Sequence, residues 1–149
     1  MLWIGIALLL ALILMAVVRL APTDAAHWHQ PLHSEAPALL CGAEAVRVET
    51  DGARVACLID MAPVAALDRL ASIAAATPRT RTIAGSPAEG RVTWETRSLI
   101  WGFPDYTTAE AHEDGAGARL DLHARSRFGR SDFGVNGARL RSWLRELAG

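Results

Sequence analysis

Residues 125–139 read RSRFGRSDFGVNGAR and lie between two segments of different periodicity. Residues 119–127 alternate apolar and polar side chains, which is the period of a half-buried strand. After the stretch, apolar residues recur at the spacing of one helix face: Leu140, Trp143, Leu144 and Leu147. A strand that leads through a glycine-containing loop into an amphipathic helix indicates an α+β fold, with the helix packed on the sheet.

The loop between this strand and this helix has an unusual composition. Gly129 and Gly134 permit backbone angles that other residues avoid. Residues 125–149 carry six arginines and two acidic residues, whereas residues 20–60 carry six acidic residues and two arginines. All 15 basic residues of the chain are arginine, the side chain best suited to planar anions. The candidate binding residues of this basic segment are Arg125, Arg127, Arg130, Ser131, Asp132, Asn136 and Arg139.

The basic segment has two interpretations, which differ in whether its arginines bind a ligand or pair with acidic residues of the protein. Backbone N–H groups at a helix start, together with nearby arginines, form a site for a phosphate or carboxylate. Alternatively, Asp132 pairs with a neighbouring arginine and caps the helix, since Ser, Asp and Asn are the common capping residues. We favour the second interpretation, in which the loop holds itself in place.

Upstream of this segment, the patterns predict further strands and one more helix. Residues 43–50 and 53–59 are expected to form a hairpin around Asp51-Gly52, a strong turn signal because both central residues need positive φ. Pro63 suits the first position of a helix that ends before Pro78. Its buried stripe is expected to contain Val64, Leu67, Leu70, Ala71 and Ala74.

Three more strands are expected, at residues 80–83, 91–100 and 106–112. Residues 101–105 interrupt the pattern with a glycine and a proline, which suggests a bulge or a sharp bend. With residues 119–127, this makes a small antiparallel sheet of about four to six strands, packed with two helices. Trp101 and Phe103, with Tyr106 and Phe128, either line an apolar pocket or belong to the core, and we favour the core.

Residues 1–21 are expected to be a transmembrane anchor. They contain no charge before Arg19, and a helix of this length spans roughly 31 Å, which matches a bilayer core. A cleaved signal peptide would have a basic start and a shorter apolar core. Residues 22–40 are polar and proline-containing and are expected to form a linker, with Trp28 at the membrane interface. Residues 41–149 form the α+β domain.

The side of the membrane is indicated by two weak and opposed signals. Arg19 alone, just after the apolar run, would place the domain in the cytoplasm. Cys41 and Cys57 form an even pair in a small domain, which suits an oxidising compartment, although two buried free thiols fit the sequence equally well. We expect a bacterial inner-membrane protein with a single span and a periplasmic domain.

The sequence contains no convincing catalytic or metal-binding pattern. His123, Ser131 and Asp132 have the residue types of a nucleophilic triad, but an adjacent Ser and Asp cannot readily flank a histidine. His27, His29 and His33 are close together, but Pro31 interrupts any helical face and no carboxylate stands at ligand spacing. A net charge of −1 does not indicate a nucleic acid partner. We therefore expect no metal, no cofactor and no enzymatic activity, and a hydrolase-type enzyme is the less favoured alternative.

Several short motifs, in order, resemble one bacterial protein family. They are Thr77-Pro78-Arg79-Thr80, Ala84-Gly85-Ser86, Glu89-Gly90-Arg91, Trp101-Gly102-Phe103-Pro104-Asp105-Tyr106 and Gly129-Arg130-Ser131-Asp132-Phe133-Gly134-Val135-Asn136, followed by Arg139. Together they resemble domain-of-unknown-function family 1499 over about residues 64–147. The resemblance implies a shared fold and no particular reaction. Gly137 stands where the resemblance leads us to expect a larger residue, which predicts a looser helix start.

From these observations we expect a membrane-anchored, non-catalytic accessory or binding protein. Its partners would be the lipid bilayer and either an anionic lipid or another membrane protein, which would meet the basic segment and the aromatic residues near Trp101. The alternative is a structural or assembly subunit of an inner-membrane complex, with the transmembrane helix as the contact.

Overall fold

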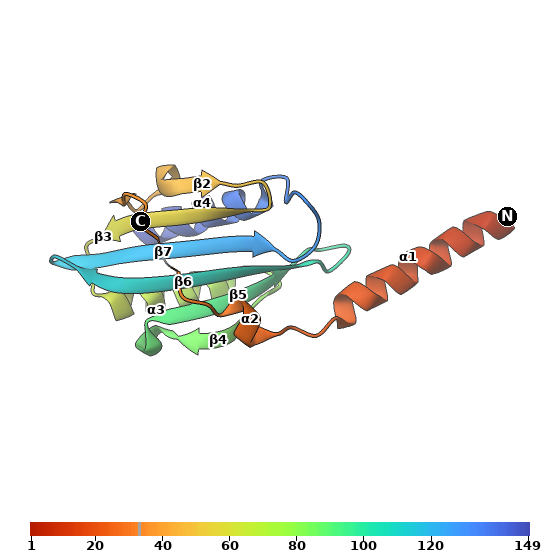
Figure 1. Ribbon diagram of the computed structural model, residues 1–149, viewed down its shortest axis with the longest axis horizontal. Helices are drawn as coiled ribbons and strands as arrows, with labels where there is room; N and C mark the ends of the chain where they lie inside the picture. Colours follow the sequence, from red (N-terminus) through yellow and green to blue (C-terminus); the bar gives the residue numbers. More distant parts are fainter. Residues whose placement is uncertain (33) are drawn as a thin grey trace.

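A computed structural model describes residues 1–32 and 34–149 of the chain and has the expected α+β architecture (Figure 1). Helix α1 leaves one end of a domain in which a sheet carries two helices on one face. The helices are α1 (Leu2–Leu20), α2 (Ala25–Trp28), α3 (Pro63–Ala76) and α4 (Val135–Ala148), with short 3₁₀ turns η1 (Ala43–Ala45) and η2 (Pro87–Glu89). The strands are β1 (Leu39–Leu40), β2 (Val46–Val48), β3 (Gly52–Ile59), β4 (Thr80–Ser86), β5 (Arg91–Arg97), β6 (Pro104–Asp114) and β7 (Gly117–Ser126).

The sheet is larger than the four to six antiparallel strands expected. In the described residues it has seven strands in the order β1-β3-β7-β6-β5-β4, and β2 also pairs with β3. The additional strand β1 pairs with β3 in parallel, so the sheet is mixed. A two-residue strand has no periodic pattern, and β1 lies in the segment that we expected to be a linker.

The turn between β2 and β3 differs from the prediction by one residue. Glu49 N–H donates to Gly52 O at 2.9 Å, so Thr50 and Asp51 are the central residues and Gly52 begins β3. Gly52 does not supply positive φ. A Cβ at this position would lie 2.2 Å from Ala124 O, so the glycine permits close approach of β7.

The interruption at residues 101–105 is a hairpin loop between two strands, where we expected a bulge or bend. Strands β5 and β6 are antiparallel neighbours, and Arg97 pairs with Pro104 at the loop end. Proline is tolerated at the first residue of a strand, where its missing N–H matters least. Residues 98–103 (loop 98–103) therefore project from the end of the sheet.

The core lies between the sheet and helices α3 and α4. Helix α3 begins at Pro63 and ends before Pro78 as predicted, and Leu67, Leu70 and Ala74 are buried. Val64 is 47 % exposed, because it lies on the solvent side of the first turn, and Ile73 completes the stripe in its place. The predicted stripe of α4 (Leu140, Trp143, Leu144 and Leu147) is buried in full.

Gly137 makes the start of α4 tight, which corrects the expectation of a looser helix start. A Cβ on Gly137 would lie 2.8 Å from Cγ2 of Val48. The glycine therefore brings α4 against β2, at the cost of lower helix propensity.

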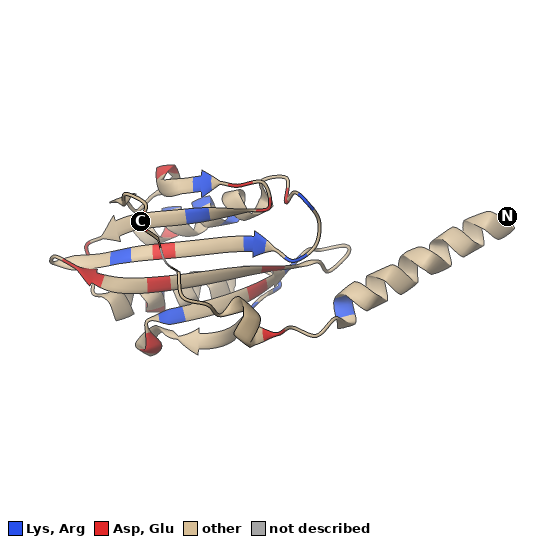
Figure 2. Cartoon of the chain, in the orientation of Figure 1, with Lys and Arg blue, Asp and Glu red and all other residues tan. Residues whose placement is uncertain are grey.

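The opposite face of the sheet is polar and is covered by residues 22–37 (the covering segment, with residue 33 outside the description). Figure 2 shows charged positions along the strands of this face. Three buried carboxylates here each pair with arginine: Glu95 with Arg81 and Arg97, Glu110 with Arg91, and Asp121 with Arg119. Arg119 also donates to Ser34 O and Ala36 O, which fixes the covering segment to the sheet.

Trp28 belongs to the covering segment and packs on the domain, where we expected it at a membrane interface. Its ring stacks on Tyr106 with centroids 4.1 Å apart, and the guanidinium of Arg125 lies 5.3 Å from its ring centroid. His29 Nδ1 lies 2.9 Å from Thr93 Oγ1. The segment therefore contributes side chains to the domain.

A disulfide joins Cys41 to Cys57, which decides between the two alternatives for this pair. It ties the chain just after β1 to the middle of β3.

Helix α1 is long and apolar enough to cross a membrane, a test that a signal sequence near the N-terminus also passes. Among its residues only Val18, near the domain, is buried.

Candidate functional site

The C-terminal end of α1 meets the domain through two arginines. Arg19 Nη2 donates to Ile100 O at 2.8 Å and to Leu99 O at 3.4 Å. In return, Arg97 Nη1 lies 3.4 Å from both Val18 O and Arg19 O and 3.1 Å from Gly102 O. The last carbonyls of a helix lack intrahelical donors, so Arg97 of β5 satisfies the end of α1 and complements its dipole.

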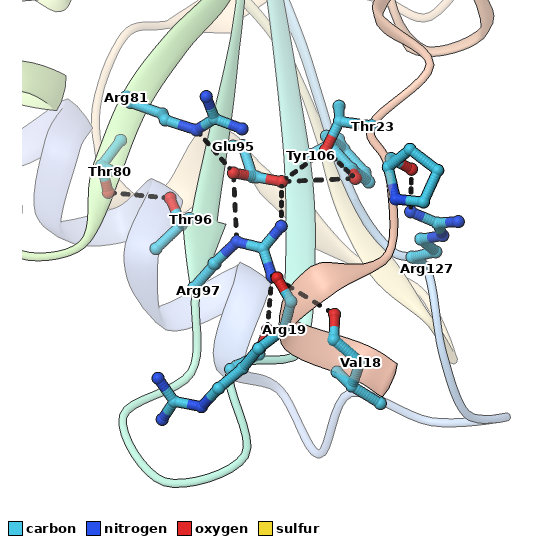
Figure 3. A network of polar contacts seen from close by, with 12 residues as sticks. Val18, Arg19, Thr23, Thr80, Arg81, Glu95, Thr96, Arg97, Tyr106 and Arg127 are labelled. Carbon is cyan, nitrogen blue, oxygen red and sulfur yellow. Dashed lines mark hydrogen bonds and ion pairs between the residues drawn. The ribbon is translucent and has the colours of Figure 1, made fainter. Parts of the chain in front are cut away.

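Arg97 is held in this position by the buried carboxylate of Glu95 (Figure 3). Glu95 accepts from Arg97 Nη2 at 2.9 Å, from Arg81 Nε at 2.7 Å and from Thr23 Oγ1 at 2.7 Å. Burial raises the pKa of Glu95, but the hydrogen bonds from Arg81, Thr23 and Arg97 outweigh burial and hold the pKa below its ordinary value. Glu95 is therefore a carboxylate at neutral pH.

Apolar side chains gather at the same end of the domain. They include Trp101, Phe103 and Phe128, which lie outside the core where we expected them, and Trp101 and Phe128 are 37 % and 38 % exposed. Phe103 lies between Trp101 and Phe128, with ring centroids 6.3 and 5.9 Å away. The exposed apolar residues here are Leu99, Ile100 and Trp101 of loop 98–103, Phe128 and Phe133 of the segment between β7 and α4, and Val135 at the start of α4. Between the loops lies a cavity of about 310 Å³ (the apolar groove). Its apolar lining is Phe103, Phe128, Phe133 and Val135, and its polar lining is Ser98, Asp105, Ser126, Ser131 and Asp132.

The structure separates the residues of the basic segment. Arg125 lies on the polar face of the sheet beneath Trp28, where burial first, and then Arg54, lowers its pKa. Arg139 lies on the helix side and donates to Asp105 at 3.1 Å and to Asn136 Oδ1 at 2.6 Å. Arg139 is thus paired with Asp105 within the protein, and Arg125 donates to Trp28 O and Thr108 Oγ1 on the polar face.

Asp132 caps the start of α4, as we favoured, but among the described residues it forms no ion pair with a neighbouring arginine, which corrects that part of the prediction. Its carboxylate accepts from Gly134 N–H and from Asn136 N–H, both at 2.9 Å. Helix α4 begins at Val135, and its N-cap residue is Gly134. Asp132, two residues before the N-cap, therefore supplies the capping side chain. Ser131 Oγ accepts from Phe133 N–H at 3.2 Å, and Phe133 has a positive φ of 52°.

One hydrogen-bonded network connects the motifs on which the family resemblance was based. Asp105 accepts from Ser126 Oγ at 2.7 Å, and Asn136 Nδ2 donates to the same Ser126 hydroxyl at 3.2 Å. With the Arg139–Asp105 ion pair, these contacts join β6, β7 and α4.

A family model described as "Protein of unknown function (DUF1499)" matches residues 23–147 of the chain. The chain belongs to the DUF1499 family. The match begins well before residue 64, where the resemblance seen in the sequence began, and so includes the covering segment. No curated protein matches the chain, and no solved structure does.

Two arginines of the basic segment remain at the surface of the DUF1499 domain near the apolar groove. Arg127 Nη1 donates to Pro22 O at 2.8 Å, and its guanidinium lies 5.1 Å from the Phe128 ring centroid. Arg130 is exposed on the loop between β7 and α4 (residues 127–134, loop 127–134). The candidate binding residues thus fall into two groups. One group lies at the end of the domain near the apolar groove: Trp101, Phe103, Arg127, Arg130 and Ser131. The other group makes contacts within the domain: Arg125, Asn136 and Arg139.

The residues considered for a nucleophilic triad lie in different surroundings. His123 is on the polar face, with Arg125 Nη1 at 3.4 Å and Glu49 at 3.8 Å from its ring nitrogens. Burial, together with Arg54 and Arg125, lowers the pKa of His123 to about 3, so the ring is neutral. Ser131 and Asp132 instead bond to the backbone at the start of α4.

The histidines of the covering segment have other contacts. His27 packs edge-on against Trp28, and His29 bonds to Thr93. His33 lies outside the described residues. Within residues 1–32 and 34–149, no group of three or more His, Cys, Asp or Glu side chains is arranged to hold a metal ion.

Sequence reasoning missed the part of this site made by Arg19, Arg81, Glu95 and Arg97. The alternation of β5 places Glu95 and Arg97 on one face, and this was visible in the sequence. Their meeting with Arg19 depends on the docking of α1, for which no local pattern exists.

Proposed function

We propose that this DUF1499 protein is a membrane-anchored, non-catalytic binding protein of the bacterial inner membrane. Helix α1 spans the bilayer, and the end of the domain formed by loops 98–103 and 127–134 rests among the lipid headgroups. The apolar groove and its neighbouring arginines are the binding surface.

The observation that carries this proposal is the position of the exposed apolar residues. Arg19, the last charged residue of α1, bonds to the backbone of Leu99 and Ile100. If α1 spans the bilayer, these two side chains, which are 70 % and 66 % exposed, lie at the level of the headgroups. Phe133, 93 % exposed, is at the same end of the domain. Exposed apolar clusters of this kind mark membrane or partner contacts.

The energetics favour contact with the membrane surface. Moving one large apolar side chain out of water contributes roughly 1.5–3 kcal/mol. Arg130 and Arg127 flank these side chains, and a basic residue near an anionic bilayer surface adds about 1 kcal/mol. Because α1 already tethers the domain, these contributions orient the domain on the bilayer.

The disulfide between Cys41 and Cys57 supports a periplasmic location for the domain. Disulfides persist in oxidising compartments and are rare in the cytosol. The basic end of the domain and Arg19 oppose this orientation by the positive-inside rule, but that rule weighs charge in short loops more than in folded domains.

The proposal is tested by measuring how deeply loop 127–134 lies in the bilayer. A nitroxide is attached to Phe133→Cys in the full chain, reconstituted in liposomes, and its collisions with oxygen and with a water-soluble nickel chelate are compared. The native cysteines are in a disulfide and do not compete for the label. The matched control is Ala116→Cys, in the exposed turn between β6 and β7 at the opposite end of the sheet.

We expect the label at position 133 to be shielded from the nickel chelate and accessible to oxygen, and the label at position 116 to show the reverse. Equal access of the chelate to both labels would contradict the proposal.

A second candidate function is that of a subunit of an inner-membrane complex. It is favoured by the surface of α1, of which only Val18 is buried among the described residues, so the helix offers an apolar side to a partner helix as well as to lipid. Co-purification of the full chain with one partner at fixed stoichiometry in mild detergent would support this candidate.

A further inference from the structure

The junction of α1 with the sheet edge contains a second cavity, of about 320 Å³, which differs in chemistry from the apolar groove. Four arginines line it: Arg19, Arg79, Arg81 and Arg97. Glu95 is the one carboxylate in its lining. We call this cavity the arginine pocket.

The positive charge in the arginine pocket is only partly neutralised by the described residues. Glu95 is 1 % exposed and engages Arg81 and Arg97. Arg19 bonds to backbone carbonyls of loop 98–103, and Arg79 Nε donates to Arg97 O at 3.0 Å. In the described part of the chain, neither of these two guanidiniums has a carboxylate within ion-pair distance.

Arg79 occupies an unfavourable backbone conformation. Its φ is +57°, in the left-handed region that L-residues other than Gly, Asn and Asp seldom adopt. The conformation is held because Arg79 and Arg97 exchange contacts: Arg97 N–H donates to Arg79 O, and Arg79 Nε donates to Arg97 O. Residues in sparsely populated backbone conformations cluster at active sites and ligand-binding sites.

The pocket also lies beside the apolar groove. Loop 98–103 stands between the two cavities, and Ser98 lines both. Arg19, at the polar end of α1, contributes to the arginine pocket, so this pocket lies where a spanning α1 meets the headgroup region. An amphiphile with a phosphate would find guanidinium donors on one side of the loop and aromatic side chains on the other.

We propose that the arginine pocket binds the phosphate of an anionic lipid headgroup. The proposal rests on the proposed membrane placement for the source of the ligand. Arginine forms charge-assisted, often bidentate hydrogen bonds with phosphate oxygens. Arg19, Arg79 and Arg81 line the pocket, and each has a terminal guanidinium nitrogen that makes no hydrogen bond within the described part of the chain. Arg97 already bonds to Glu95 and to the last carbonyls of α1, so its role is to hold the pocket in shape and not to bind the phosphate.

The test measures binding to the full chain in non-ionic detergent micelles by isothermal titration calorimetry. The probes are dioctanoyl phosphatidylglycerol, dioctanoyl phosphatidylcholine, glycerol 3-phosphate and inorganic phosphate. The variant is Arg79→Asn, because asparagine tolerates the left-handed conformation. The matched control is Arg145→Asn, which removes one exposed arginine at the far end of α4 whose Nε also bonds to a backbone carbonyl.

We expect wild type and Arg145→Asn to bind phosphatidylglycerol with the same affinity, and Arg79→Asn to bind it roughly tenfold more weakly, the loss typical of one hydrogen bond to a charged group. Phosphatidylcholine should bind more weakly, because its choline is repelled. Arg81→Asn is a second variant with the same expected loss, should Arg79→Asn fail to fold.

Equal affinities in Arg79→Asn, Arg81→Asn and Arg145→Asn would overturn the proposal. Binding of inorganic phosphate or glycerol 3-phosphate as tightly as phosphatidylglycerol would overturn the lipid source and assign the pocket to a soluble phosphate. Binding in micelles does not depend on how the domain rests on a bilayer, so failure here is distinguishable from failure of the nitroxide experiment.

Discussion

Replacing Asp132 with alanine removes both hydrogen bonds that begin α4. Asp132 is 7 % exposed, and its carboxylate accepts from Gly134 N–H and from Asn136 N–H at 2.9 Å each. Loss of a capping side chain costs about 1 kcal/mol. Asn136 is fully buried, so its N–H loses its partner without access to water, which adds roughly 1–3 kcal/mol. We expect the free energy of unfolding to fall by about 3 kcal/mol.

The assay is thermal unfolding of the full chain in detergent micelles, followed by circular dichroism. For a domain of this size, 3 kcal/mol corresponds to a decrease in Tm of about 10 °C. Ser131→Ala is the matched control, because Ser131 makes one exposed hydrogen bond at 3.2 Å and its loss costs roughly 0.5 kcal/mol. Asp132→Asn keeps one acceptor oxygen and should fall between the two.

A Tm for Asp132→Ala within about 2 °C of wild type would refute this account of the loop. It would mean that the carboxylate does not stabilise the start of α4. The alternative interpretation, in which the basic segment binds an anion, would then be favoured.

Three further predictions concern other parts of the domain. His123, with its pKa lowered to about 3, stays neutral in the folded protein, so below pH 6.5 the unfolded chain binds a proton that the folded chain does not, and stability falls with pH down to about pH 3. Urea titrations should show a loss on the order of 2 kcal/mol from this residue between pH 7.5 and 5, and the loss should disappear in His123→Gln. Reduction of the Cys41–Cys57 disulfide, which closes a segment of 16 residues, should cost about 3 kcal/mol; reductant should lower the Tm of wild type and leave the Cys41→Ser/Cys57→Ser variant unchanged. Trp28→Ala should cost about 2 kcal/mol through lost stacking on Tyr106, and hydrogen exchange should become faster in residues 23–37 and remain unchanged in α3 and α4.

The elements that sequence predicted correctly are those with strong local periodicity. The stripe of α4, the proline start of α3 and the alternation of β7 each depend on neighbours within two turns or one strand. The errors at Gly52 and Val64 have a different origin. Gly52 is a glycine because the β7 backbone approaches it, and this contact lies about 70 residues away in the chain.

The candidate site was harder to predict than the fold. Strand parity alone would have separated Arg125 from the loop, because Leu122 and Ala124 face the core and Arg125 must then face the opposite side. The pairing of Arg139 with Asp105 and the meeting of Arg97 with Arg19 join distant segments, and no spacing rule indicates them. Apart from the short helix α2, the described residues of the covering segment form no helix or strand, and side chains of the sheet hold them in place.

The bonds between Arg97 and the last carbonyls of α1 have a mechanical consequence. Because they join the end of the helix to β5, we expect the helix and the sheet to turn together. A helix whose apolar length exceeds the local hydrocarbon thickness tilts to compensate. If α1 spans a membrane as we propose, such a tilt would rotate the domain with it, and the membrane thickness would influence the angle at which β4 and its arginines face the lipid.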